Sequence, residues 1–68
     1  MKPVSGKRMC KLLEARGWWL ERIAGSHHIY YHPTTRRRTT VPVHGAADLK
    51  PKTQRSIMRD AGIIDADL

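Results

Sequence analysis

Apolar residues near the start of the chain recur at the spacing of an amphipathic helix. Met9, Leu12 and Leu13 fall at positions i, i+3 and i+4, so they form one stripe along residues 6–16. Ser5 suits the N-cap of this helix, and the glycine after the segment suits a stop in the left-handed conformation. The pattern predicts a first helix over residues 6–16.

The pattern then changes to three runs rich in β-branched and aromatic residues, at residues 18–24, 27–32 and 36–43. A glycine–serine pair separates the first two runs, and Pro33 with two threonines separates the last two. Connections this short require antiparallel pairing of neighbouring strands. Pro42 has no backbone N–H for a ladder, which favours an edge position for the third strand. We therefore expect a three-stranded meander.

A second helical pattern follows a loop over residues 44–50. Pro51 suits the first turn of a helix, apolar residues recur at helical spacing as far as Ala61, and Gly62 suits the stop. The order α-β-β-β-α predicts a two-layer α+β domain. Two amphipathic helices would cover one face of an antiparallel three-stranded sheet and leave the other face open to solvent.

The length of the chain allows one domain. Its 68 residues are expected to form a single unit over residues 1–68, with an ordered core at about residues 5–63. The last residues, from Asp65 to Leu68, are acidic and lie beyond the helical pattern. They predict a frayed tail.

The charge of the chain is strongly positive and unevenly distributed. The formal net charge is +7, and four of the six acidic residues lie in the last third. The segment from Arg22 to His44 contains no carboxylate. This asymmetry favours a nucleic acid, an acidic protein or both as partners.

The sequence offers little for redox, metal or membrane chemistry. Cys10 is the only cysteine, so it cannot form an internal disulfide and is expected to pack as a small apolar residue in a reducing compartment. The four histidines lack a cysteine or carboxylate partner at zinc-ligand spacing, so no metal or other cofactor is expected. No apolar run is long enough to cross a bilayer. We expect a cytoplasmic protein that is monomeric when free.

The segment Gly25-Ser26-His27-His28 combines groups for anion contact with imidazoles. Glycine lets a phosphate approach the backbone closely, serine supplies a hydroxyl, and imidazole transfers protons near pH ~6.5. Adjacent histidines in a strand point to opposite faces, so they cannot share one role. Alternation alone does not say which of the two is exposed, and a purely structural histidine remains an alternative.

Cations elsewhere in the chain suit a polyanion. Arginine binds phosphate through two N–H groups at once, and alternation along a strand would send Arg36 and Arg38 to one face. Lys50 and Lys52 flank the start of the second helix, where backbone N–H groups already favour an anion. These four side chains are candidates for holding a phosphate backbone.

Three further side chains allow two interpretations each. Trp18 and Trp19 have the aromatic rings on which bases stack, although one of the two is expected in the core. For His44, a hydrogen bond that orders its loop is the favoured interpretation, and a role as a second acid–base group is the alternative.

A set of short motifs runs through almost the whole chain, from about Ser5 to Ile63. In order, they are Gly17-Trp18, Gly25-Ser26-His27-His28, His32-Pro33, Val41-Pro42-Val43-His44-Gly45, Leu49-Lys50-Pro51, Thr53 and Ala61-Gly62. In this order and spacing the chain resembles the HicA toxins, the small mRNA-cleaving partners in HicA–HicB toxin–antitoxin pairs. Trp19 and Glu21 are unusual for the first strand of that family.

The resemblance implies a fold, a catalytic residue and a partner. The fold would be similar to that of double-stranded RNA-binding domains. The catalytic histidine would be the one directly after the glycine–serine pair, which is His27, and His28 would be its structural neighbour. The activity would be mRNA cleavage that stops growth, silenced when an acidic HicB-like antitoxin covers the toxin.

The favoured hypothesis is an endoribonuclease with His27 as general acid or base. RNA carries its own nucleophile, the 2′-OH, so such an enzyme needs only proton transfer and stabilisation of the phosphate charge. One alternative is a module that binds double-stranded RNA without cutting it, and another is a purely protein-binding domain. The expected RNA-binding residues are Gly25, Ser26, Arg36, Arg38, Lys50 and Lys52.

Overall fold

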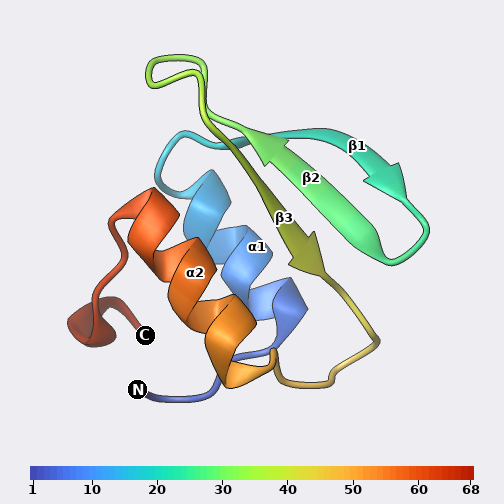
Figure 1. Cartoon of the computed structure of the whole chain (residues 1–68), viewed down its shortest axis with the longest axis vertical. Coiled ribbons are helices and arrows are strands. Elements are labelled where there is room, and N and C mark those ends of the chain that lie inside the picture. Colours follow the sequence, from blue (N-terminus) through green and yellow to red (C-terminus); the bar gives the residue numbers. More distant parts are fainter.

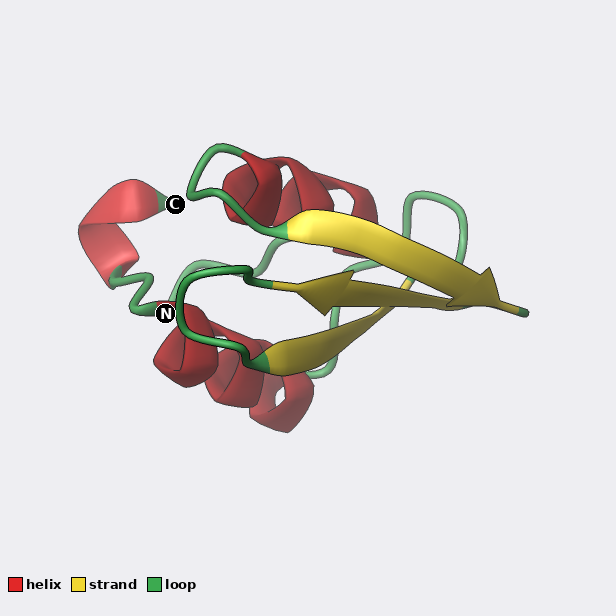
Figure 2. Ribbon diagram, turned by 90° about the horizontal axis from the view of Figure 1, so that it is seen from above, coloured by secondary structure: helices red, strands yellow, loops and turns green.

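The computed structural model describes all 68 residues and has the predicted order of elements. The three strands form one antiparallel sheet in the order β1-β2-β3. Both helices lie on the same face of this sheet, and its other face is open (Figures 1 and 2). The α+β prediction is thus confirmed. The elements are α1 (Gly6–Glu14), β1 (Trp19–Ala24), β2 (His27–Tyr31), β3 (Arg38–Pro42), α2 (Pro51–Ala61) and a 3₁₀ turn, η1 (Asp65–Asp67).

Helix α1 begins and ends through local hydrogen bonds. The Ser5 hydroxyl accepts the Arg8 backbone N–H at 3.1 Å, as expected of an N-cap. The α-helical span ends at Glu14, earlier than predicted, because the last turn tightens into a Schellman motif. The N–H of Gly17, at φ +89°, donates to the Glu14 carbonyl, and the N–H of Trp18 donates to the Leu13 carbonyl. Trp18 thereby enters the core directly after the helix.

The core lies between the helices and the inner face of the sheet. Tyr30 of β2 and Val41 of β3 are fully buried, and they belong to the alternating set that faces the helices. Strand β3 is an edge strand, as Pro42 predicts. The buried apolar residues are Val4, Met9, Cys10, Leu13, Trp18, Tyr30, Val41, Leu49, Ile57, Met58 and Ile63.

The segment before α1 is held against α2 by a buried amide. The Gln54 Oε1 atom accepts the Val4 N–H at 3.2 Å, and Nε2 donates to the Lys2 carbonyl at 2.6 Å. The Val4 carbonyl in turn accepts the Leu49 N–H at 2.9 Å. Gln54 therefore fills a core position without leaving its amide unpaired.

The end of the chain differs from the frayed tail expected there. Residues Asp65–Asp67 form the 3₁₀ turn, in which the Asp67 carboxylate accepts the Ile64 N–H at 2.9 Å. The same carboxylate forms an ion pair with Arg16 at 2.6 Å, and Leu68 packs against the core. The acidic composition of this segment did not reveal that Arg16, in the loop after α1, would be the partner of Asp67.

Candidate nucleic-acid interface

Strands β1 and β2 form a hairpin whose tip extends beyond the helices (Figure 1). Ala24 pairs with His27, so Gly25 and Ser26 are the two central residues of the turn. Gly25 has φ +60°, the requirement for the first central residue of a type II′ turn. The Ser26 carbonyl accepts the Val43 N–H at 2.8 Å, which ties the tip to the end of β3.

The structure separates the two histidines that strand alternation left equivalent. His28 pairs with the buried Val41 and shares its face with Tyr30, so it points toward the helix side and is half-buried. His27 pairs with Pro42 and is exposed on the open face. Only His27 is therefore presented to a ligand on the open face.

Two more rows of side chains continue this face beyond His27. Cross-strand pairing places Arg22 beside Ile29, and Trp19 beside Tyr31. Trp19 is 61% exposed, whereas Trp18 is 4% exposed, which confirms that only one of the two tryptophans is in the core. The open face thus joins an imidazole, a cation and aromatic rings in one surface.

Arg38 lies on this face but already has partners. Its guanidinium is 4.8 Å from the centroid of the Tyr31 ring, and its Nε and Nη2 atoms donate to the Glu21 carboxylate at 3.0 and 3.1 Å. The hydrogen bonds from Arg38 hold the pKa of Glu21 below its usual value. Glu21, unusual in this strand, therefore neutralises one of the predicted RNA-binding cations.

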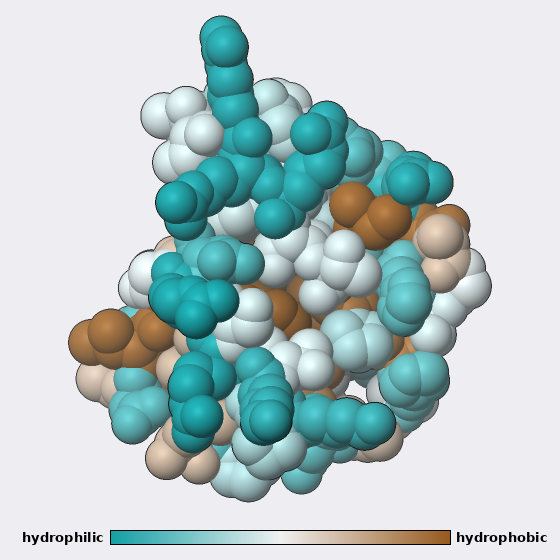
Figure 3. Space-filling view, in the orientation of Figure 1, coloured by the Kyte–Doolittle hydropathy of each residue, from teal (hydrophilic) through white to brown (hydrophobic).

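The rest of the arginine run lies away from His27. Strand β3 begins at Arg38, so Arg36 and Arg37 belong to the loop after β2, and the prediction that Arg36 and Arg38 share a strand face is wrong. Arg36 has φ +61°, which is incompatible with a strand. Five residues of β2 separate this loop from the tip, roughly 13 Å along the strand. Hydrophilic side chains extend from this loop at the top of Figure 3.

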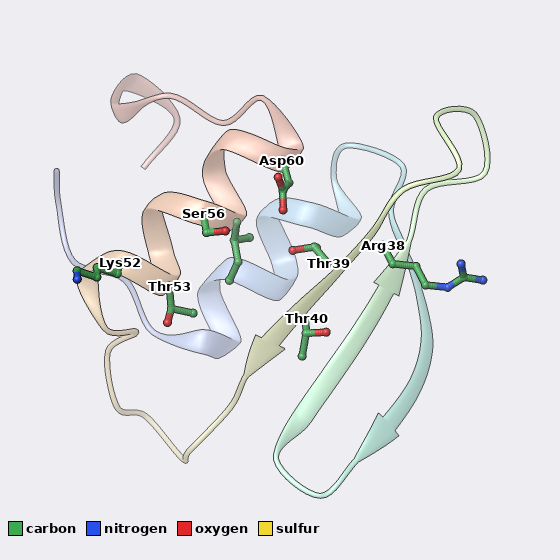
Figure 4. A pocket seen from close by; sticks show the side chains of 8 residues that line it. Arg38, Thr39, Thr40, Lys52, Thr53, Ser56 and Asp60 are labelled. Atoms are coloured by element: carbon green, nitrogen blue, oxygen red, sulfur yellow. The ribbon is translucent and has the colours of Figure 1, made fainter.

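The lysines lie at the N-terminus of α2. Lys50 is the N-cap residue and Pro51 follows at the first helical position, as predicted. Lys50 lines a hollow together with Pro42 and His44. Pro42 is the residue of β3 that pairs with His27, so this hollow adjoins the hairpin tip. Lys52 lines a separate polar groove between α2 and β3 (Figure 4). In Figure 4 the Arg38 side chain points away from that groove.

The structure thus brings together only part of the predicted set. The hairpin turn, His27 and the hollow with Lys50 lie at one end of the sheet, while Arg36 and Arg38 lie at the other. The sequence reasoning did not select Arg22 and Tyr31 as parts of the surface. The position of Arg22 depends on a β-bulge between Leu20 and Arg22, for which the alternating pattern gives no signal.

Among the four histidines, only His32 uses its ring nitrogens in hydrogen bonds within the chain. Its Nδ1 atom accepts the Thr34 and Thr35 N–H groups at 3.2 and 3.4 Å, so Nε2 carries the proton that it donates to the Arg16 carbonyl at 3.1 Å. Its ring also meets the Trp18 ring edge-on, at 5.3 Å between centroids. His32 therefore joins the β2–β3 loop to the end of α1.

Replacing His32 by alanine is expected to lower the free energy of unfolding by about 1–2 kcal/mol, because the loop and the end of α1 lose their link. Urea denaturation followed by tryptophan fluorescence measures this change. The exposed His44 contributes to the order of its loop through its backbone carbonyl, which accepts the Ala47 N–H at 3.0 Å, and not through its ring. His44→Ala is the matched control, and an equal loss in both variants would contradict the role assigned to His32.

The side chains of Cys10 and Tyr30 are potential nucleophiles, but both have a structural role in the core. Burial raises the pKa of the Cys10 thiol, and burial together with hydrogen bonds to Cys10 and Glu14 raises the pKa of the Tyr30 phenol. The Tyr30 hydroxyl donates to the Glu14 carboxylate at 2.7 Å. Both groups stay protonated in the core, as expected for Cys10.

Comparison with known proteins identifies the family. The model of the family described as the HicA toxin of bacterial toxin–antitoxin systems matches residues 6–63, which is most of the chain. No curated protein matches the chain at a significant level. Neither helix has the length and apolar composition needed to cross a membrane. The chain belongs to the HicA toxin family and is the toxin component of a toxin–antitoxin system.

Proposed function

We propose that this toxin is an endoribonuclease that cleaves mRNA without a metal ion and uses His27 as a general acid or base. The observation that carries this proposal is the position of His27, an exposed imidazole with no hydrogen bond inside the chain, at the tip of the hairpin on the open face. A proton-transfer group must be free to meet the atom it serves. Membership of the HicA family supports the same role.

The turn beside His27 suits the phosphate that is attacked. Gly25 has no side chain to obstruct a phosphate, and space around its Cα is open. The Ser26 hydroxyl and the Lys50 ammonium would supply hydrogen bonds and positive charge at this end of the sheet. Arg22 would hold the neighbouring phosphate on the open face, and Arg36 would contact RNA farther along. Arg38 would have to exchange its ion pair with Glu21 for one with phosphate to do the same.

Two aromatic rings on the open face, the exposed Trp19 and the half-buried Tyr31, extend the proposed RNA path. Trp19 and Tyr31 lie side by side on the open face, on the same side of the sheet as His27. Unpaired bases stack on such rings, whereas paired bases in a duplex are not available for stacking. The open face therefore favours single-stranded mRNA over duplex RNA as the substrate.

His44 is the proposed second acid–base group. The hydrogen bond between Val43 and Ser26 holds the chain just before His44 against the hairpin tip, and the pairing of Pro42 with His27 continues this contact. His44 is exposed and lines the hollow next to this pair. One imidazole would accept the proton of the 2′-OH, and the other would donate a proton to the leaving 5′-oxygen.

The His44→Ala variant is expected to lose one limb of a bell-shaped dependence of kcat/KM on pH, and ~10²–10⁴-fold in rate, because one of the two proton transfers would pass to water. Cleavage rates measured between pH 5 and about pH 9 test this. A variant that keeps the full bell shape at the wild-type rate would exclude His44 as the second group.

Purified toxin incubated with EDTA and with single-stranded or duplex RNA separates the proposed enzyme from a binding module. Cleavage of the single strand is expected, because RNA supplies its own nucleophile. Duplex RNA that is retarded in a gel and intact, with single strands also uncut, would favour a non-catalytic double-stranded RNA-binding module.

The proposed partner is an acidic, HicB-like antitoxin that covers His27 and the surrounding cations. Membership of a toxin–antitoxin family implies an antitoxin. The net charge of +7 would speed encounter with an acidic protein.

A further inference from the structure

The face of the β1–β2 hairpin that points toward the helices carries an apolar surface that the fold covers only in part. Every residue of β1 is exposed, including Leu20 at 44% and Ile23 at 54%. We propose that this surface, with the adjoining face of α1, binds an acidic amphipathic segment of the antitoxin. The proposal rests on the family membership described above and does not depend on the ribonuclease activity.

A β-bulge puts both apolar side chains on one face. Leu20 and Ile23 are three positions apart, so a regular strand would send them to opposite faces. The register shifts between Leu20 and Arg22, and Leu20 pairs with Tyr30 while Ile23 pairs with His28. Residues paired directly share a face, so both point to the helix side. Bulges re-aim side chains in this way next to functional surfaces.

Helix α1 covers this face only in part and leaves a hollow of about 340 Å³. Leu20, Tyr30 and Val43 form its apolar wall, and His28 lies at the side nearest the hairpin tip. Burial of exposed apolar surface on this scale contributes to association roughly in proportion to the area removed from water. The hollow is therefore suited to apolar side chains from another molecule.

Cations on α1 border the apolar wall and indicate the charge of the occupant. Lys7 and Lys11 are exposed and one helical turn apart, so they lie on the same face as Glu14, and all three line the hollow. Glu14 is engaged by the Tyr30 hydroxyl. This hydrogen bond does not remove the charge of Glu14, but the two lysines outnumber it, so the net charge on this border is positive. A positive border suits an apolar segment flanked by carboxylates and disfavours a neutral or basic one.

The position of this surface also matches the task of an antitoxin. His28 lines the hollow, and its neighbour His27 lies on the opposite face of the same strand. A segment seated under the hairpin would attach the antitoxin beside the catalytic face without competing for the residues of that face. Inhibition and anchoring would then use two different surfaces of one hairpin.

The test uses the wild-type toxin, the Leu20→Glu and Ile23→Glu variants, and the cognate antitoxin of this toxin as the probe. Ile64→Glu is the matched control, since Ile64 is 63% exposed at the other end of the fold. Titration calorimetry is expected to show affinity lower by roughly 30-fold or more for Leu20→Glu and Ile23→Glu, the loss typical of an interface hot spot, and unchanged affinity for Ile64→Glu. The double variant K7E/K11E, which leaves the apolar surface intact, is expected to slow association and reduce its salt dependence.

Measurements on the free variants separate the alternatives. The circular dichroism spectra of the variants, and their RNA cleavage without antitoxin, are expected to match those of the wild type. If the ribonuclease proposal fails, cleavage will be absent in every sample, whatever the measured affinities for the antitoxin. Wild-type affinity in Leu20→Glu and Ile23→Glu would overturn the inference. The inference would also be overturned if these variants lost only RNA binding, because RNA would then occupy the surface. It would equally be overturned if the wild-type toxin were a dimer that these variants convert to a monomer, because a second copy of the chain would then occupy it.

Discussion

Replacement of His27 by alanine is expected to lower the rate of RNA cleavage by ~10²–10⁴-fold, the usual contribution of a positioned general acid or base. The side chain is exposed and makes no hydrogen bond within the chain, so its removal leaves no buried group unpaired. Stability and RNA affinity should therefore remain close to wild type. Single-turnover cleavage of a labelled single-stranded RNA measures the effect, and fluorescence anisotropy measures the affinity.

His28→Ala is the matched control for this experiment. It removes the neighbouring imidazole from the other face of the same strand, where it lines the hollow beside α1. Cleavage by this variant is expected to stay within a few-fold of wild type once the folded fraction is corrected. Full activity in a folded His27→Ala protein, or equal losses in both variants, would refute the assignment.

Replacement of Gly6 by alanine is expected to lower the free energy of unfolding by about 3 kcal/mol, at the upper end of overpacking effects. A Cβ atom at this position would overlap the backbone carbonyl oxygen of Pro42 and crowd Val43. Backbone atoms cannot rotate away, so α1 and the end of β3 would have to separate. Glycine-to-alanine changes in helices usually stabilise, so the sign of the effect is itself diagnostic.

The Gly6→Ala variant also connects the fold with the site. Pro42 pairs with His27, so movement of this strand end should lower cleavage as well as stability. Thermal unfolding and cleavage of the folded protein measure the two effects. Gly45→Ala is the control: Gly45 has φ +57° with open space around it, and only backbone strain of about 1 kcal/mol is expected. A Gly6→Ala protein as stable as wild type would show that α1 does not pack this closely on β3.

Much of the fold follows from short-range patterns in the sequence. The stripe of Met9 and Leu13, the Ser5 cap and the Gly17 stop define α1, and Pro51 defines the start of α2. These signals act over one or two helical turns, so they can be read without knowing the tertiary structure. The edge position of β3 follows equally from one proline.

The parts that the sequence did not predict depend on contacts between distant segments. Asp67 is ordered by Arg16, and Arg38 is paired with Glu21 across the central strand. Spacing along the chain carries no information about such pairs. Strand alternation also left His27 and His28 equivalent, because the exposed face is decided by where both helices pack.

The bulge in β1 is the clearest example of this limit. One extra residue changes the faces of Leu20 and Ile23 relative to each other, and it places Arg22 beside Ile29 on the open face. The regular period of a strand would have predicted a different surface. Both the proposed RNA path and the proposed antitoxin surface depend on this local irregularity.

The chemistry of the cut ends tests the central claim most directly. If His27 assists attack by the RNA 2′-OH, purified wild-type toxin in EDTA should leave 2′,3′-cyclic phosphate and 5′-hydroxyl termini, and a substrate lacking that single 2′-OH should remain intact. Mass spectrometry of the fragments identifies the termini. Cleavage of the deoxy-substituted substrate, or fragments with 5′-phosphate ends, would contradict this mechanism.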